Sequence, residues 1–350
     1  MREETKMEET REKNRISAVN IVFLITMIIS VVVSVLPLDF LEPYPALNVI
    51  ISQLILAIPV AVYMIKEKLP YRETVHLKKM KMTDVFLTLV FGILLQPVLT
   101  LINAISMVFS TNMTNTFLLG MSQQLPFLVT LLLVAFIPCV FEETVYRGFF
   151  YQQYKKIDPW KAVLLSGFLF GLMHGNLNQF CYATAMGIVF ALLIEATGSI
   201  LSTMLIHFAV NGFSVVVMYL YPHLYEIMKG FYKMYVDMGD TYMSEMISTA
   251  FGDMTLTGDE WMTQMFTTTV KVGLVDVLSL YLTPAVFSGV LAYFVFRTIA
   301  IRTGNWERIR GFFGNKREDA QPMVTIPLMI AIAIGVLVMF FYEMLMRLPR

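Results

Sequence analysis

Long runs of apolar residues, separated by short polar segments, dominate this chain of 350 residues. A run of about 20 apolar residues is long enough for a helix to cross the hydrocarbon core of a bilayer. The pattern predicts an all-α, polytopic membrane bundle with about eight to nine transmembrane helices. The candidate windows, of which the fifth and sixth are short, are residues 18–38, 46–65, 84–109, 125–145, 161–175, 179–196, 199–221, 272–297 and 323–346.

Composition agrees with this class of protein. Hydrophobic residues make up 57% of the chain and charged residues only 15%, whereas soluble domains have about 25% charged residues. The formal net charge is zero, so no basic excess indicates a nucleic-acid partner, and the expected partner is the lipid bilayer. Cys139 and Cys181 lie inside apolar runs without disulfide or zinc spacing, and we interpret both as small buried residues.

The distribution of polar segments divides the chain into five parts. The first apolar run is too long for the core of a signal peptide, so we expect it to remain as a signal anchor. The parts are a cytoplasmic arm at 1–17, amino-terminal transmembrane helices at 18–121, a core at 122–221, an extramembrane segment at 222–269, and carboxyl-terminal transmembrane helices at 270–350.

Basic residues indicate the orientation, because cytoplasmic loops of membrane proteins are enriched in Lys and Arg. With nine crossings and a cytoplasmic amino terminus, all the basic segments fall on the cytoplasmic side. The loops 39–45 and 110–124, on the opposite side, contain no Lys or Arg. We therefore predict a multi-pass protein of the cell membrane. The basic segments are 1–17, 66–81, 147–161 and 297–317.

Two further segments permit structural predictions. Segment 222–269 has helical spacing of apolar residues among charges, which is compatible with an amphipathic helix on the outer membrane surface or with a solvated loop. Segment 146–161 is rich in aromatic residues followed by lysines. This order is typical of an interfacial helix extension, with the aromatic rings at the level of the lipid headgroups.

Two adjacent acids, Glu142 and Glu143, stand at the end of the fourth apolar window. A charge in hydrocarbon costs about 2.5–3.5 kcal/mol even on the lenient insertion scale, so ionisable residues there indicate a function. Glu143 and Arg147 are four residues apart and can pair on one helix face, which leaves Glu142 free to face another partner. An interfacial salt bridge without catalytic function is the structural alternative.

Two histidines lie in later apolar windows, each with a companion four residues away. Phe170 and His174 share one helix face, and His207 and Asn211 share another. A transmembrane histidine or asparagine also serves as an interhelical hydrogen-bonding group, and that alternative stays open for each motif. Small residues at Gly167, Gly171 and Gly175, beside His174, predict close helix packing.

Three helices can direct Glu142, His174, His207 and Asn211 towards one interior point. A carboxylate or an imidazole can take a proton from water, and imidazole and carboxamide groups can donate hydrogen bonds to an oxyanion. This set therefore has the groups needed to hydrolyse an amide. His174 lies about 20 Å beyond Lys161 along a helix, so it can meet Glu142 only if the fourth helix continues past Arg147 or the fifth begins in an interfacial segment.

In this order, the three motifs resemble the signature of the CAAX-protease and bacteriocin-processing family of intramembrane proteases, including CAAX prenyl protease 2-like members. The resemblance covers about residues 125–215. It implies that Glu142 is the general base that activates water, assisted by His174. It implies that His207 and Asn211 hold the oxyanion. Glu143 and Arg147 would shape the site, with Glu143 itself a candidate catalytic residue and Phe170 a supporting one.

The resemblance leaves the dependence on metal open. Glu142, His174 and His207 are a permissible set of zinc ligands with an open position. Neither histidine belongs to a His-Glu-x-x-His helix, which is the strong signal for a zinc protease. We therefore favour a glutamate-type, metal-free protease, with zinc as the alternative cofactor.

Three functions compete at this point. An intramembrane endopeptidase would act on a membrane-associated peptide or a lipidated protein, such as a prenylated tail or a leader peptide. A transporter or proton-coupled carrier would use the same residue types within its spans, although we find no repeated halves in the sequence. A non-catalytic immunity or binding protein is the third alternative.

Overall fold

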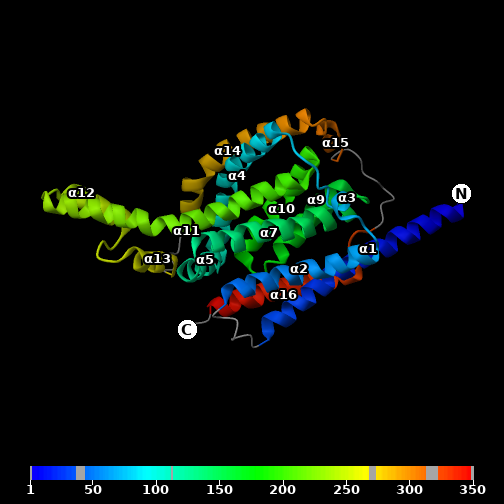
Figure 1. Ribbon diagram of the computed structural model, residues 1–350, viewed down its shortest axis with the longest axis horizontal. Coiled ribbons are helices and arrows are strands. Elements are labelled where there is room, and N and C mark those ends of the chain that lie inside the picture. Colours follow the sequence, from blue (N-terminus) through cyan, green and yellow to red (C-terminus); the bar gives the residue numbers. More distant parts are fainter. Residues whose placement is uncertain (1, 37–43, 112, 268–272, 313–321, 348–350) are drawn as a thin grey trace.

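The computed structural model describes residues 2–36, 44–111, 113–267, 273–312 and 322–347 (Figure 1). Its architecture is the predicted polytopic helical bundle, and eight described helices are long and apolar enough to cross a membrane. These long helices are α1 (Arg2–Val35), α2 (Pro45–Lys66), α4 (Met82–Phe109), the composite helix Phe127–Tyr154, α10 (Leu177–Thr197), α11 (Ile200–Asp237), α14 (Leu274–Arg302) and α16 (Ile326–Arg347).

Shorter helices connect or cap the long ones. The fifth predicted window forms α9, which has 14 residues and is therefore about 21 Å long, less than the thickness of the hydrocarbon core. The sixth window forms a full-length helix, α10. The short helices are α3 (Tyr71–Thr74), α5 (Met113–Gln124), α9 (Pro159–Leu172), α12 (Thr241–Phe251), α13 (Gly258–Thr267) and α15 (Trp306–Gly311).

Helices α9 and α10 form a tight hairpin in the centre of the bundle. A Cβ atom added at Gly187 would lie 2.7 Å from the Cα atom of Gly167, and one added at Gly171 would lie 2.7 Å from the Phe180 carbonyl oxygen. Only glycine permits two backbones to approach this closely. The predicted packing role is thus confirmed for Gly167 and Gly171, whereas Gly175 has a φ of +66° in the turn between the helices.

The predicted basic segments that the structure describes meet at one end of the bundle. In the loop before α4, the His76 carbonyl oxygen accepts a hydrogen bond of 3.1 Å from the Ile200 amide at the start of α11. The buried Glu195 carboxylate, near the end of α10, binds Lys155 after the fourth span and Arg308 in α15. The predicted topology requires this common end, which lies on the right in Figure 1. Its cytoplasmic location stays a prediction.

The aromatic segment after Arg147 forms the predicted helix extension and is buried among neighbouring helices, while its position at headgroup level stays a prediction. The composite helix continues to Tyr154, and Phe149, Phe150, Tyr151 and Tyr154 are fully buried. The Tyr154 hydroxyl donates a hydrogen bond of 2.7 Å to Asn20 of α1. Alternation of aromatic rings and polar groups looks interfacial in sequence, but here the surrounding helices cover the rings and satisfy the hydroxyl.

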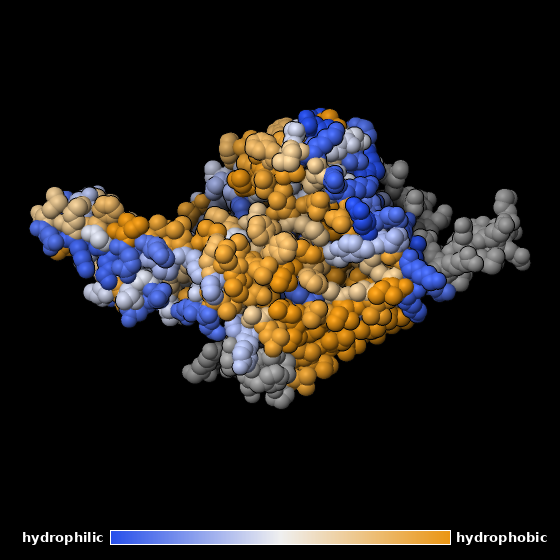
Figure 2. Space-filling model, in the orientation of Figure 1, coloured by the Kyte–Doolittle hydropathy of each residue, from blue (hydrophilic) through white to orange (hydrophobic). Residues whose placement is uncertain are grey.

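Residues 222–267 are mostly helical, so this segment is not an open loop, and its predicted place on the outer membrane surface stays a prediction. Helix α11 continues as one rod to Asp237, and α12 and α13 fold back against it. Tyr225 and Trp261 stack with ring centroids 4.9 Å apart and hold this extension together. Figure 2 shows apolar side chains over the flank of the bundle and hydrophilic ones near α3 and α15, as expected for a lipid-facing flank and a polar end.

Candidate active site

The composite helix Phe127–Tyr154 carries both acids in an irregular stretch. Two π-helical segments, Leu132–Phe136 and Thr144–Phe150, flank the seven α-helical residues that contain Glu142 and Glu143. Such segments occur often at functional sites because they re-aim side chains. The irregularity has a sequence cause at one end, since Pro138 has no amide hydrogen to donate to the carbonyl of Val134. Asn211 of α11 donates to that oxygen instead, at 3.1 Å.

The continuation of this helix also places the acids at the depth of His174. Glu142 lies about 18 Å from the helix end at Tyr154, and His174 lies about 22 Å from the start of α9 at Pro159. Tyr154 and Pro159 belong to neighbouring helices, α8 (Tyr151–Tyr154) and α9, which are in contact. Of the two arrangements that the sequence permits, the structure therefore adopts the longer fourth helix.

Glu143 is the centre of a fully buried ion-pair network. Its Oε1 atom lies 3.1 Å from Arg147 Nη1 and 2.8 Å from His207 Nδ1, and the three side chains are 0%, 1% and 2% exposed. A carboxylate paired with arginine accepts hydrogen bonds, so His207 Nδ1 carries the hydrogen. This contact fixes the imidazole ring and directs its other nitrogen, Nε2, towards Glu142.

Aromatic rings enclose this network. The Arg147 guanidinium carbon lies 4.2 Å from the Phe170 ring centroid and 5.2 Å from that of Phe190. The Phe170 ring also meets the rings of His174 and His207, with centroids 5.0 and 6.1 Å apart. Such cation–π contacts are stronger when desolvated. Phe170 therefore packs against the Arg147 guanidinium and supports both histidines.

Glu142 points away from this network and into a cavity. Its Oε1 atom accepts a hydrogen bond of 3.0 Å from Gln53 Nε2 of α2, and its Oε2 atom lies 3.8 Å from His207 Nε2. The second distance is too long for a direct hydrogen bond, and contacts of this length in proteins are often bridged by a water molecule.

His174 is oriented by its own helix. Its Nδ1 atom lies 2.8 Å from the Phe170 carbonyl oxygen. Because a carbonyl oxygen can only accept, Nδ1 carries a hydrogen, and in the neutral ring Nε2 has a free lone pair. A second contact closes the turn behind the ring, where Asn176 donates to the His174 carbonyl oxygen at 3.1 Å.

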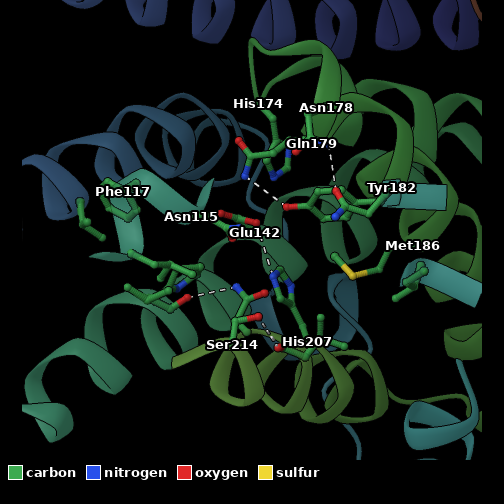
Figure 3. Close-up of a pocket in the computed structure, with 18 of the residues that line it drawn as sticks. Asn115, Phe117, Glu142, His174, Asn178, Gln179, Tyr182, Met186, His207 and Ser214 are labelled. Atoms are coloured by element: carbon green, nitrogen blue, oxygen red, sulfur yellow. Dashed lines mark hydrogen bonds and ion pairs between the residues drawn. The ribbon is translucent and has the colours of Figure 1, made fainter. Parts of the chain in front are cut away.

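Glu142, His174, His207 and Asn211 all line one cavity of about 380 Å³. Figure 3 shows Glu142 between the two histidines, with His174 and His207 on opposite sides of it. A second cavity, of about 600 Å³ between α1, α2, α9 and α16, also reaches Glu142 and His174. The two cavities share Ser52, Gln53, Glu142 and His174, so the carboxylate lies where they meet.

Carboxamide side chains line much of the first cavity, from Gln96, Asn103, Asn115, Asn178 and Gln179. Asn178 is 1% exposed and donates to Asn103 Oδ1 at 2.9 Å and to Ser106 Oγ at 2.7 Å. Amide groups both donate and accept hydrogen bonds, as peptide main-chain groups do. The lining is therefore chemically suited to an extended peptide.

The three candidate zinc ligands do not form a metal-binding group. Among the described residues, no three His, Cys, Asp or Glu side chains come together as they would around an ion. Glu142, His174 and His207 share the cavity, and Gln53 holds one of the Glu142 oxygens. Glu143 and the Phe170 carbonyl oxygen hold the Nδ1 atoms of the histidines, an arrangement that metal-ligating histidines also have. A metal-free mechanism therefore stays a prediction.

The structure thus brings together every residue that the sequence nominated, namely Glu142, Glu143, Arg147, Phe170, His174, His207 and Asn211. Two neighbours were missed. Gln53 and Phe190 lie in apolar windows far from the motifs, and Phe190 has no sequence signal. The only signal for Gln53 was a polar residue inside the second window.

The fold and the site together define a polytopic membrane protein with a polar cavity inside its helical bundle. Residues 124–213 match a family model described as type II CAAX prenyl endopeptidase Rce1-like. The matched segment is similar to the CAAX-protease and bacteriocin-processing family of intramembrane proteases, and the match supports a CAAX-type endopeptidase in general. No curated protein and no solved structure matches the chain significantly. Helices α1, α2, α4, α14 and α16 lie outside the matched segment.

Proposed function

We propose that this protein is a glutamate-type intramembrane endopeptidase that hydrolyses a membrane-associated peptide, such as a prenylated CAAX-type tail. The convergence of Glu142, His174 and His207 on one cavity carries this proposal. The family match supports hydrolysis over the alternatives of a proton-coupled carrier and a non-catalytic immunity or binding protein.

In the proposed reaction, Glu142 takes a proton from a water molecule as that water attacks the scissile carbonyl carbon. The electrons of the carbonyl π bond move to oxygen, which gives a tetrahedral oxyanion. The carbon–nitrogen bond then breaks, and the proton held by Glu142 passes to the departing amine. The products are one peptide with a new carboxylate and one with a new amine. His174 Nε2, with its free lone pair, would orient the attacking water.

His207 and Asn211 would stabilise the oxyanion. The Glu143 carboxylate holds His207 Nδ1 and directs Nε2 towards the cavity, where an Nε2 hydrogen would meet the oxyanion. Asn211 uses one amide hydrogen on the Val134 carbonyl oxygen, and its second hydrogen would be available to the substrate. Preorganised donors of this kind contribute about 2.7–4 kcal/mol each to transition-state stabilisation.

The proposal also includes the orientation of the protein and its membrane. We place the end that carries the basic loops in the cytoplasm and the protein in the cell membrane, in accordance with the positive-inside rule. The extension made by the end of α11, α12 and α13 would then lie outside. The substrate would reach Glu142 through the cavity between α4, α10 and α11, where carboxamides can bind its main chain.

The direct test is cleavage of fluorogenic peptides, prenylated and unmodified, by the purified protein in lipid nanodiscs, with and without a chelator. We expect cleavage that the chelator leaves unchanged. Loss of activity with the chelator and recovery with zinc would contradict the metal-free proposal. A protein that cleaves none of the peptides but moves a solute down a pH gradient in vesicles would contradict the protease proposal itself.

A further inference from the structure

Helix α2 carries one polar side chain in an otherwise apolar buried stripe. The buried residues of this helix are Val49, Gln53, Leu56, Val60 and Met64, which lie on one helical face. Gln53 is 8% exposed. A buried carboxamide costs about 1–3 kcal/mol unless its hydrogen-bonding groups find partners. The presence of Gln53 in this apolar stripe therefore needs a specific explanation.

The partner of this carboxamide is the candidate general base. Gln53 Nε2 donates to Glu142 Oε1 at 3.0 Å. Among the described residues, this is the one hydrogen bond that the Glu142 carboxylate receives. The Gln53 Oε1 atom is buried without a partner. The carbonyl group of this side chain therefore accepts no hydrogen bond, while its amide group donates to Glu142.

The contact fixes the rotation of the carboxylate. With Oε1 held by α2, Oε2 is the oxygen on the side of His207, 3.8 Å from Nε2. Gln53 also lies where the two cavities meet, beside Glu142 and His174. An oxygen held by an amide donor remains in place, and the other oxygen is left to receive a proton from the solvent molecule that it faces.

We propose that Gln53 is a positioning residue of this site, which acts through its hydrogen bond to orient the Glu142 carboxylate. The inference rests on the proposed function. It assigns a role to a residue of α2, a helix outside the segment 124–213 that matches the family. In this account the amino-terminal helices complete the catalytic apparatus in addition to surrounding it.

The test substitutes Gln53→Met, which keeps the length of the side chain and suits the apolar stripe but removes the donor. Hydrogen bonds to charged groups are worth about 1.5–3 kcal/mol, so we expect kcat to fall about tenfold to a hundredfold with KM within about twofold of wild type. A loss confined to kcat is expected because the lost bond orients the carboxylate and does not bind the substrate. Gln53→Leu also suits the apolar stripe and cannot donate, so it should show the same fall.

Val60→Ala is the matched control. Val60 lies two turns further along the same buried face and is 2% exposed, but it lines neither cavity. It should weaken the packing of α2 without lowering kcat. The inference is overturned if Gln53→Met keeps the wild-type kcat, or if Gln53→Met and Val60→Ala lower kcat equally.

A second measurement separates failure of this inference from failure of the proposed function. The infrared carboxylate band of Glu142, assigned by its loss in Glu142→Gln, should shift in Gln53→Met and stay unchanged in Val60→Ala. A protein that cleaves no peptide but shows this shift would refute the protease proposal and retain the positioning contact. An unshifted band in Gln53→Met refutes the contact, whatever the protein cleaves.

Discussion

His207 Nδ1 lies 2.8 Å from Glu143 Oε1, in the interior of the bundle, and the same oxygen lies 3.1 Å from Arg147 Nη1. One carboxylate therefore orients an imidazole and neutralises a guanidinium at once. The second acid of the Glu-Glu pair is thus a structural anchor for the histidine, while the first faces the cavity.

This relationship predicts two separable effects of Glu143→Gln. Breaking a buried ion pair from one side costs about 3–5 kcal/mol, because it leaves an uncompensated charge. The melting temperature should therefore fall, and kcat should fall about tenfold to a hundredfold because His207 loses its orienting partner. The double variant Glu143→Gln/Arg147→Met should recover stability without recovering activity. Recovery of both in the double variant would show that His207 does not depend on Glu143.

Asn211 replaces the hydrogen bond that Pro138 cannot make. In the wild-type background, Asn211→Ala leaves the part-buried Val134 carbonyl without this donor, and we expect a loss of about 1–3 kcal/mol in stability. In a Pro138→Ala background the helix amide can serve that carbonyl, so the same substitution should cost less. Thermal unfolding of the four proteins of this double-mutant cycle measures the difference. Equal costs in both backgrounds would contradict the compensation.

The α9–α10 hairpin positions His174 through glycine contacts. Gly187→Ala would put a methyl group 2.7 Å from the Gly167 Cα atom, so α9 must move away from α10. We expect a lower melting temperature and reduced activity, because His174 lies in the turn between these two helices. Gly230→Ala, in α11, meets no atom within 4 Å and is the control. It should be neutral or stabilise by about 0.5–1 kcal/mol through helix propensity.

The proposed orientation can be tested by cysteine labelling in a background with Cys139 and Cys181 replaced by serine. A cysteine at Gly239, in the turn between α11 and α12, should react with an impermeant maleimide on intact cells. A cysteine at Lys78, in the loop before α4, should react only after permeabilisation. The reverse pattern would place the basic loops outside and refute the assignment.

Sequence alone predicted most of the helices and the full set of motif residues, because apolar runs and ionisable residues inside them are strong signals. It did not predict the π-helical segments, because these depend on contacts between helices, such as the hydrogen bond from Asn211 to the Val134 carbonyl oxygen. It did not predict that Tyr151 and Tyr154 are buried among other helices, because burial depends on which helices cover the rings. Gln53 was hidden for the same reason: periodicity shows that it faces the bundle but not that it faces Glu142.

The most direct test of the account is turnover of a cleavable peptide by Glu142→Gln. This variant keeps the size of the side chain but removes the group that accepts a proton from water, so kcat should fall at least about a hundredfold while the melting temperature changes little. Glu195→Gln, which removes a buried carboxylate bound to Lys155 and Arg308, is the control and should lose stability but retain turnover. A folded Glu142→Gln protein that cleaves the peptide at the wild-type rate would contradict the central role assigned to Glu142.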